Sequence, residues 1–257
     1  MIKIINLAVI IPTLNRPRSL QISLKSIKNQ TTKPKEVIVV DNNKLKINRS
    51  IIINFNKKYK TNYRYISFLS SQNAPSARNY ASTKTNCKFL AFLDDDDYWK
   101  KNYLEEFNKI NENKKSDLYI TEYHVVNEFK KKLFDFNIKT NFYKNDLYLW
   151  NPGIISSNII IRKKIFDQIN KFDNSISGSA DKDLLIKILD HKMKYYVIKK
   201  KLVFWTKHKT QWSQNYSLLL KNNLLFYKKY QNKFDIITRL KFIKKIIYLF
   251  TRKILQN

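Results

Sequence analysis

The chain has 257 residues, 43% of them hydrophobic, and its 50 lysines and arginines against 20 acidic residues give a formal net charge of +30. This length and composition argue against disorder and allow a single domain with a sizeable core. One cysteine excludes a disulfide framework and a multi-cysteine metal site, and two glycines exclude glycine-rich phosphate loops. The charge predicts attraction to polyanions such as nucleic acid, an anionic membrane face or phosphorylated substrates.

Neither a targeting signal nor a membrane span is expected. The first eleven residues are mostly apolar, but a proline and two arginines follow, and no small-residue cleavage site is present. No uncharged apolar stretch approaches about 18 residues, the length that a transmembrane helix needs. We therefore expect a cytoplasmic protein, with peripheral binding at the inner face of the cell membrane as an option.

Short apolar runs alternate with helical patterns in the first half of the chain, which predicts βαβ units and a parallel sheet. The expected strands are residues 7–11, 36–40, 63–68 and 88–93. The expected helices between them are residues 18–28, 47–59 and 76–83. Three of these strands end in polar or acidic residues, and ligands of open α/β sheets lie beyond the carboxyl ends of the strands.

The second half of the chain is less regular. Strands are expected at residues 118–126, 158–162 and 195–199, and helices at 163–169, 181–189 and from 217 to the end. We therefore expect one catalytic α/β domain over residues 1–215 and a basic helical tail over residues 216–257.

Four consecutive aspartates, Asp94 to Asp97, follow the strand expected at 88–93. Clustered carboxylates repel one another unless a cation neutralises them, and Mg²⁺ or Mn²⁺ binds carboxylates together with substrate phosphates. The alternative is a solvated acidic turn in which one aspartate caps a helix that starts near Trp99. We favour the metal–phosphate site, because four of the chain's 20 acids stand here.

Four segments resemble the family 2 glycosyltransferases of the GT-A fold, in their order and spacing as well as their residues. They are VIIPTLNR at 9–16, EVIVVDN at 36–42, ARN at 77–79 and FLDDDD at 92–97. The resemblance is close over residues 6 to about 110, looser to about 215, and absent from the last 40. It implies a Rossmann-like, mostly parallel sheet flanked by helices. It also implies an inverting hexosyl- or N-acetylhexosaminyltransferase that builds a bacterial polysaccharide or lipid-linked glycan from a nucleotide sugar, usually a UDP-sugar.

The resemblance also implies a donor site. The residues that correspond to the nucleotide pocket are Pro12, Thr13, Asn15 and Arg16. Asp41 stands where an aspartate of the family contacts the base, and Arg78 stands where an arginine approaches the nucleotide.

The aspartate run resembles the family's D-x-D motif. Asp94 then faces the ribose, Asp95 lies at the donor, and Asp96 holds Mn²⁺ or Mg²⁺ on the diphosphate. Because four aspartates are consecutive, a register with Asp95 and Asp97 is the alternative.

A late basic segment resembles one that folds over the diphosphate in the family. In it, His208 completes the metal shell, and Lys207 or Lys209 holds phosphate. The alternative is a surface histidine in a basic loop. Independently of the resemblance, three large aromatic residues are candidates to stack on sugar faces, with a place in the core or pocket wall as the alternative: Trp99, Trp150 and Trp212.

The catalytic base is expected in the second half of the chain. Residues 179–184 (SADKDL) resemble the family's Glu-Asp-x-Asp-Leu segment, which makes Asp181 the candidate general base. The family's glutamate is replaced by Ala180, which changes the support of the base. Asp183 is then a structural or acceptor-contacting residue, or the base itself if the alignment shifts by two.

Residues 218–257 contain ten lysines and arginines and one acid. Apolar residues recur there at four- and three-residue steps and form one helical stripe. The stripe consists of Ile236, Leu240, Ile243, Ile247, Phe250 and Ile254, widened by Phe242, Ile246 and Leu249. Such a basic amphipathic helix can lie on an anionic membrane surface, which suits a lipid-linked acceptor. The alternative is a helix that packs its stripe on the catalytic domain.

Two other functions are considered. A sugar-nucleotide-forming nucleotidyltransferase needs a glycine-rich basic loop after the first strand, and residues 12–16 contain no glycine. A non-catalytic polyanion-binding protein needs only the charge, but no helix-turn-helix, zinc-finger or RNA-recognition motif is present, so no specific nucleic acid partner is expected.

Overall fold

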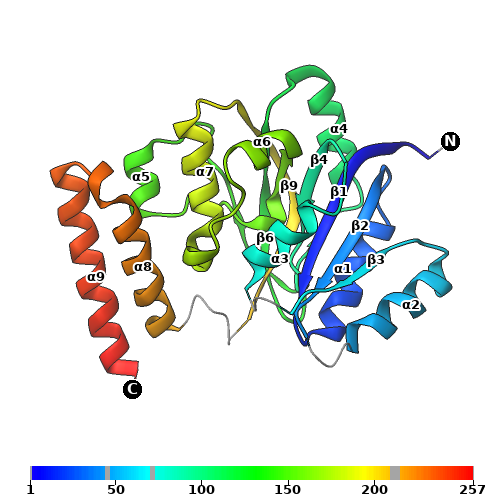
Figure 1. Ribbon diagram of the computed structural model, residues 1–257, viewed down its shortest axis with the longest axis horizontal. Coiled ribbons are helices and arrows are strands. Elements are labelled where there is room, and N and C mark those ends of the chain that lie inside the picture. The colour runs from blue at the N-terminus through cyan, green and yellow to red at the C-terminus, as the bar shows by residue number, and fades with distance from the viewer. Residues whose placement is uncertain (1, 44–46, 70–72, 209–214, 257) are drawn as a thin grey trace.

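The computed structural model describes residues 2–43, 47–69, 73–208 and 215–256 as one twisted sheet flanked by helices (Figure 1). Its strands are β1 (Ile4–Thr13), β2 (Lys33–Asp41), β3 (Arg64–Ser67), β4 (Phe89–Phe92), β5 (Tyr98–Trp99), β6 (Leu118–Asn127), β7 (Lys132–Phe136), β8 (Ile159–Arg162) and β9 (Tyr195–Lys207). The helices are α1 (Pro17–Lys28), α2 (Ile47–Tyr59), α3 (Ala74–Ser82), α4 (Tyr103–Lys114), α5 (Lys144–Leu149), α6 (Lys163–Gln168), α7 (Ala180–Asp190), α8 (Tyr216–Tyr230) and α9 (Ile236–Gln256). The short 3₁₀ turns are η1 (Ser156–Asn158), η2 (Asn174–Ser179) and η4 (Gln231–Lys233).

The first four strands form the parallel half of the sheet, in the order β3-β2-β1-β4. The apolar runs of β1 and β4 are buried, as helices on both sides of a parallel sheet require. Thr13 at the end of β1 pairs with Asp41 at the end of β2. The polar ends of the predicted strands therefore meet at one edge of the sheet.

The second half adds β8, β6, β9 and β5 to the sheet, with β8 antiparallel to both β4 and β6. The strand expected at 195–199 continues to Lys207, because ten residues of β6 pair with β9. The alternative of a helix starting near Trp99 is wrong, since Tyr98 and Trp99 pair with β9 and α4 begins at Tyr103. Neither β7 nor α5 was predicted from the sequence.

The tail forms a helical hairpin, α8 and α9, at the end of the molecule farthest from α2 (Figure 1). Asp235 separates the helices and accepts a hydrogen bond from the Thr238 N–H at 2.6 Å, which caps the start of α9. Phe242 and Leu249 are buried on the inner face of α9, and Phe242 contacts Phe226 of α8.

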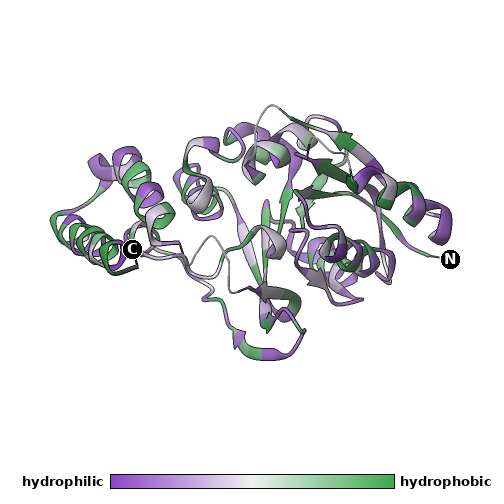
Figure 2. Ribbon diagram, turned by 90° about the horizontal axis from the view of Figure 1, so that it is seen from below, coloured by the Kyte–Doolittle hydropathy of each residue, from purple (hydrophilic) through white to green (hydrophobic). Residues whose placement is uncertain are grey.

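The predicted stripe lies mostly on the other face of α9. Ile236 is 79% exposed, Leu240 is 63% and Ile254 is 58%. Figure 2 shows α9, the helix that leads to the C-terminus, with much of its ribbon in the hydrophobic colour. Among the described helices, none is long and apolar enough to cross a bilayer.

Candidate active site

The four aspartates lie in a turn after β4 that divides them into a buried and an open pair. Asp95 accepts a hydrogen bond from the Thr13 hydroxyl at 2.7 Å. Asp97 accepts from Ser157 Oγ at 2.6 Å and from the Thr206 backbone N–H at 2.9 Å. Burial raises the pKa of Asp95 to about 7 and the pKa of Asp97 well above its usual range. The carboxylates of this buried pair are therefore engaged in holding the turn.

Asp94 and Asp96 form the open pair, with side chains 33% and 14% exposed. The Arg78 guanidinium donates a hydrogen bond to Asp94. Arg16 Nη1 lies 2.6 Å from Asp96 Oδ2, and His208 Nε2 lies 3.3 Å from the same oxygen. The hydrogen bond with Asp96 raises the pKa of His208. Three basic side chains thus gather at the two aspartates that are open to a ligand.

Asp96 and His208 bring one carboxylate and one imidazole nitrogen to a common point. This donor set fits Mn²⁺ or Mg²⁺ when phosphate oxygens complete the shell, because such ions are commonly held by one or two carboxylates plus substrate phosphates. In the described part of the chain, no group of three or more histidine, cysteine or acidic side chains is arranged to hold a metal. The protein ligands therefore suit an ion that is shared with a bound diphosphate.

The loop after β1 reaches from the core to the rim of this site. Pro12 and Thr13 are buried, whereas Asn15 and Arg16 are exposed. Asn15 adopts a left-handed backbone conformation with φ 55°, and its side-chain oxygen accepts a hydrogen bond from Asn43 of the loop after β2. Of the four residues expected at the nucleotide pocket, Thr13 and Arg16 therefore contact the aspartate turn, and Asn15 contacts the loop after β2.

Asp41 is fully buried beneath this rim. Its carboxylate accepts hydrogen bonds from the Asn43 N–H at 3.0 Å, from Asn48 Nδ2 at 3.2 Å and from the Tyr65 hydroxyl at 3.0 Å. The structure thus engages Asp41 in organising the end of β2, and its contact with a nucleotide base remains a prediction.

Arg78 on α3 is buried next to both candidate carboxylate sites. Burial lowers its pKa, but the carboxylates of Asp94 and Asp181 outweigh burial, so the pKa is raised. The guanidinium carbon lies 5.6 Å from the centre of the Phe172 ring. Arg78 Nε is buried and has no hydrogen-bond partner among the residues that the structure describes. A buried cation with a spare donor is well suited to an anionic ligand.

Asp181 lies in the first turn of α7 and is partly exposed. Ser156 Oγ donates a hydrogen bond to Asp181 Oδ1 at 2.6 Å. Burial raises the pKa of Asp181, while the charge of Arg78 and the hydrogen bond from Ser156 act in the opposite direction. Ser156 thus supports Asp181 from outside the motif in which Ala180 replaces the family's glutamate.

Asp183, two residues later, points to a different environment. It is fully buried, and Lys229 and the Tyr230 hydroxyl of α8 donate hydrogen bonds to it. Lys187 of the next turn lies 3.1 Å from its other oxygen. Of the interpretations left open by the sequence, this geometry supports a structural residue that ties α8 to α7.

Three late residues of the predicted site remain, and two of them, Lys209 and Trp212, belong to segment 209–214, which the structure does not describe. The third, Lys207, is exposed at the end of β9. The sequence did not identify the hydroxyl side chains of Ser156, Ser157 and Thr206 as part of the site. Serine and threonine carry no distinctive spacing here, and Thr206 meets Asp97 across 109 residues of chain, so no local pattern indicated them.

Comparison with known proteins gives the family. Residues 8–169 match the model of Glycosyl transferase family 2. A GalNAc(5)-diNAcBac-PP-undecaprenol β-1,3-glucosyltransferase of Campylobacter jejuni is 36% identical over 96 residues, which are 35% of this chain and 29% of that protein. The poly(ribitol-phosphate) β-N-acetylglucosaminyltransferase TarP of Staphylococcus aureus is 31% identical over 121 residues, which are 46% of this chain and 36% of that protein. The matches thus span little more than a third of these relatives at most.

Solved structures show the same fold at low identity. S. aureus TarS residues 1–349 in complex with UDP-GlcNAc has a TM-score of 0.66 at 17% identity, over 95% of this chain and 81% of that chain. The mannosyltransferase PcManGT of Pyrobaculum calidifontis, in complex with GDP-Man and Mn²⁺, has a TM-score of 0.67 at 13% identity, over 90% of this chain and 65% of that chain. The predicted GT-A fold is thereby confirmed. Because the family model matches more than half of the chain's residues, the chain belongs to glycosyl transferase family 2.

Proposed function

We propose that the chain transfers a sugar from a nucleoside diphosphate donor, with UDP as the nucleotide, to a hydroxyl of a glycan or lipid-linked acceptor. The observation that carries this proposal is the open pair Asp94 and Asp96, surrounded by Arg16, Arg78 and His208. The names of the relatives agree with it, since one acts on an undecaprenol-linked glycan and another on poly(ribitol-phosphate). One solved neighbour holds UDP-GlcNAc.

Asp181 acts as the general base in this proposal. Its partly buried carboxylate accepts the proton of the acceptor hydroxyl as that oxygen attacks the anomeric carbon. The Ser156 hydroxyl fixes one carboxylate oxygen, and Arg78 favours the ionised form that a base requires. A single base on the acceptor side, with no second carboxylate acting as nucleophile, gives a direct displacement that inverts the anomeric configuration.

The open aspartates and their basic neighbours act on the leaving group. Asp96 and His208 would hold Mn²⁺ or Mg²⁺, which neutralises charge on the departing diphosphate. Arg78 offers its spare Nε–H to the same anion, and Arg16 and Lys207 place positive charge at the rim. Asp94, held by Arg78, is left to contact the ribose.

Release of UDP from UDP-glucose and UDP-GlcNAc tests this proposal. We expect the wild type to release UDP from at least one donor, and Asp181→Asn to be slower by about 10² or more, because the base is lost. UDP affinity should stay within twofold in that variant. Asp167→Asn, which alters a surface ion pair on α6, is the matched control and should behave like the wild type. Equal rates for Asp181→Asn and the wild type would remove Asp181 from the chemistry.

We further propose that α9 binds an anionic membrane surface. Its inner face is fixed to the body, where Lys245 donates to the Leu149 carbonyl at 2.8 Å and Phe242 is buried. Its outer face leaves large apolar side chains exposed, namely Ile236, Ile237, Leu240, Ile243, Ile247, Tyr248, Phe250, Ile254 and Leu255. With ten basic residues and one acid over 218–257, the helix has the composition of one that lies in the headgroup region.

Co-sedimentation with phosphatidylcholine vesicles, with and without phosphatidylglycerol, tests the membrane proposal. The full chain should bind the anionic vesicles, and the double variant Leu240→Asn/Ile247→Asn should bind roughly tenfold more weakly, because it removes inserted apolar area. Leu133→Asn/Phe134→Asn on β7 removes exposed apolar residues elsewhere and should have no effect. Binding that does not depend on anionic lipid, or that survives in the α9 variant, would contradict the proposal.

A further inference from the structure

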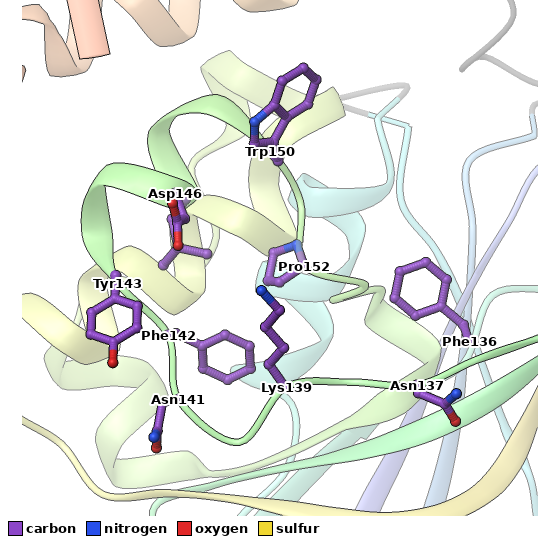
Figure 3. Close-up of a pocket in the computed structure, with 10 residues that line it drawn as sticks. Phe136, Asn137, Lys139, Asn141, Phe142, Tyr143, Asp146, Trp150 and Pro152 are labelled. Atoms are coloured by element: carbon purple, nitrogen blue, oxygen red, sulfur yellow. The ribbon is translucent and has the colours of Figure 1, made fainter. Parts of the chain in front are cut away.

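A cavity of about 340 Å³ lies between the end of β7, the segment after it, and α5 (Figure 3). Its wall includes the rings of Phe136, Phe142, Tyr143 and Trp150. Figure 3 shows Phe136 on one side and Phe142 and Tyr143 on the other, with Lys139 reaching between them. Among the residues that the structure describes, none of the donor residues named above lines this cavity, so it is distinct from the donor site.

The lining combines aromatic rings with the hydrogen-bonding groups of Lys139, Asn141 and Asp146. Tyr143 and Trp150 are 67% and 64% exposed, so their ring faces are accessible to a ligand that enters the cavity. Lys245 of α9 lies over the Trp150 ring, 5.4 Å from its centre, and so helps to position the indole. Flat apolar rings beside amide, ammonium and carboxylate groups match a pyranose ring, which has apolar C–H faces and a polar hydroxyl edge.

The cavity wall continues directly into the support of Asp181. Beyond Pro152 the chain turns at Gly153 and reaches Ser156, whose hydroxyl binds Asp181. Gly153 has φ +95°, and a Cβ there would overlap the Phe136 ring, so glycine is required at this position. It is one of only two glycines in the chain.

Side-chain hydrogen bonds hold this turn in one conformation. Asn151 Oδ1 accepts from the Gly153 and Ile154 N–H groups, at 3.0 Å and 2.8 Å. Asn158 Nδ2 donates to the Gly153 carbonyl at 3.0 Å. On the other side, Lys182, directly after Asp181, extends toward the Tyr148 carbonyl of α5 at 3.4 Å. The cavity is therefore held in a fixed relation to Asp181.

We propose that this cavity binds a pyranose ring of the acceptor, adjacent to the ring that carries the reacting hydroxyl. The assignment rests on the proposed function and extends it, because it makes the acceptor at least a disaccharide unit. The stacking surfaces are the rings of Trp150 and Phe142. The hydroxyl groups of the sugar form hydrogen bonds with Lys139, Asn141 and Asp146.

The test compares disaccharide and monosaccharide probes as acceptors. The disaccharide acceptors are methyl β-cellobioside and methyl β-chitobioside. The matching monosaccharide acceptors are methyl β-glucoside and methyl β-N-acetylglucosaminide. The donor is UDP-glucose or UDP-GlcNAc, whichever the wild type turns over. UDP release is measured against acceptor concentration. We expect at least one disaccharide to reach half-saturation at a roughly tenfold lower concentration than its monosaccharide, a gain of one stacked ring.

Variants locate the effect. Trp150→Ala should abolish the disaccharide advantage, and Trp150→Phe should keep most of it. Phe129→Ala removes an 83% exposed ring outside the cavity and is the control. Equal half-saturation for both probe lengths in the wild type, or an advantage that survives in Trp150→Ala, overturns the subsite and leaves the proposed function standing. A wild type that turns over neither donor counts against the proposed function itself.

Discussion

In both the aspartate turn and helix α9, side chains of one kind are divided between a buried and an exposed face. The two regions differ in what the exposed side chains meet. In the turn, the buried Asp95 and Asp97 accept hydrogen bonds from hydroxyl groups. The open Asp94 and Asp96 face Arg78 and Arg16, and Arg16 also lies 3.1 Å from Asp95. In α9, the buried Phe242 packs on α8, whereas a longer row of apolar side chains stays in solvent.

The contrast indicates where each region meets a ligand. Buried carboxylates that are hydrogen-bonded are stable as they stand, so the ligand-ready groups of the turn are its exposed members. A row of exposed apolar side chains is unfavourable in water, so the exposed face of α9 is the one that a partner would cover. Polar satisfaction and apolar exposure therefore distinguish the two surfaces that we propose, one for a nucleotide and one for a membrane.

The open half of the turn should give the greatest change on mutation. Asp96→Ala should lower UDP release by about 10² to 10³, because a group that neutralises the leaving diphosphate is lost. The free energy of unfolding of Asp96→Ala should stay within about 0.5 kcal/mol of the wild type, because relief of repulsion among the aspartates offsets the loss of the ion pair with Arg16. Denaturant unfolding and a UDP-release assay measure both quantities. A stability loss as large as the activity loss would erase the distinction between open and buried aspartates.

The next largest effect is expected for a mutation on the inner face of α9. Phe242→Ala should lower the free energy of unfolding by about 3 kcal/mol, because it opens a cavity between α8 and α9. The outer-face variant Ile247→Ala should change it by less than about 0.5 kcal/mol. Urea titrations of both variants check the comparison, and similar losses would mean that the two faces are not as different as their exposure indicates.

A mutation in the buried pair of the aspartate turn is expected to have a smaller effect. Asp97→Ala leaves the Ser157 hydroxyl and the Thr206 N–H without their acceptor, and should cost about 2 kcal/mol of stability. UDP affinity per folded molecule should fall far less than in Asp96→Ala. Calorimetric titration of the folded protein with UDP separates a loss of affinity from a loss of stability. If Asp97→Ala weakened UDP binding without lowering stability, Asp97 would be a ligand-binding residue instead.

A shift of a pH profile should be the weakest of these effects. Burial raises the pKa of Asp181 and Arg78 lowers it, so activity is expected to fall as the pH drops through a pKa above the usual aspartate range. Arg78→Met removes the opposing charge, and the acidic limb of kcat/KM should move to higher pH, on top of a lower maximal rate. A limb that stays in place would show that another group limits the reaction at low pH.

The sequence predicted much of the first half of the molecule, for a physical reason. Strands such as β1 and β4 are buried on both faces, so their apolar runs are continuous, and α2 begins and ends at the predicted residues 47 and 59. The motifs lie at strand ends, and the candidate donor residues were assigned to them from their resemblance to the family.

The rest depended on contacts between distant segments. A helical period in 236–254 reveals that α9 has faces, but contacts with earlier aromatic residues decide that Phe242 turns inward. These residues are Phe226, Tyr227 and Phe234. In the same way, the hydrogen bonds that hold Asp95 and Asp97 in the buried positions come from Thr13, Ser157 and Thr206, which approach from three other segments. Periodicity gives the angle between side chains and not the neighbour that each one meets.

The open pair, Asp94 and Asp96, is proposed to form a metal-dependent donor site. Calorimetric titration of UDP, GDP and CMP into the full chain tests this, with Mn²⁺ and with a chelator, in the wild type and in Asp96→Ala. We predict that UDP binds in the presence of Mn²⁺, that the chelator weakens binding at least tenfold, and that Asp96→Ala shows the weak binding in both conditions. UDP affinity that is the same with metal, with chelator and in the variant would contradict a metal-dependent site at Asp96.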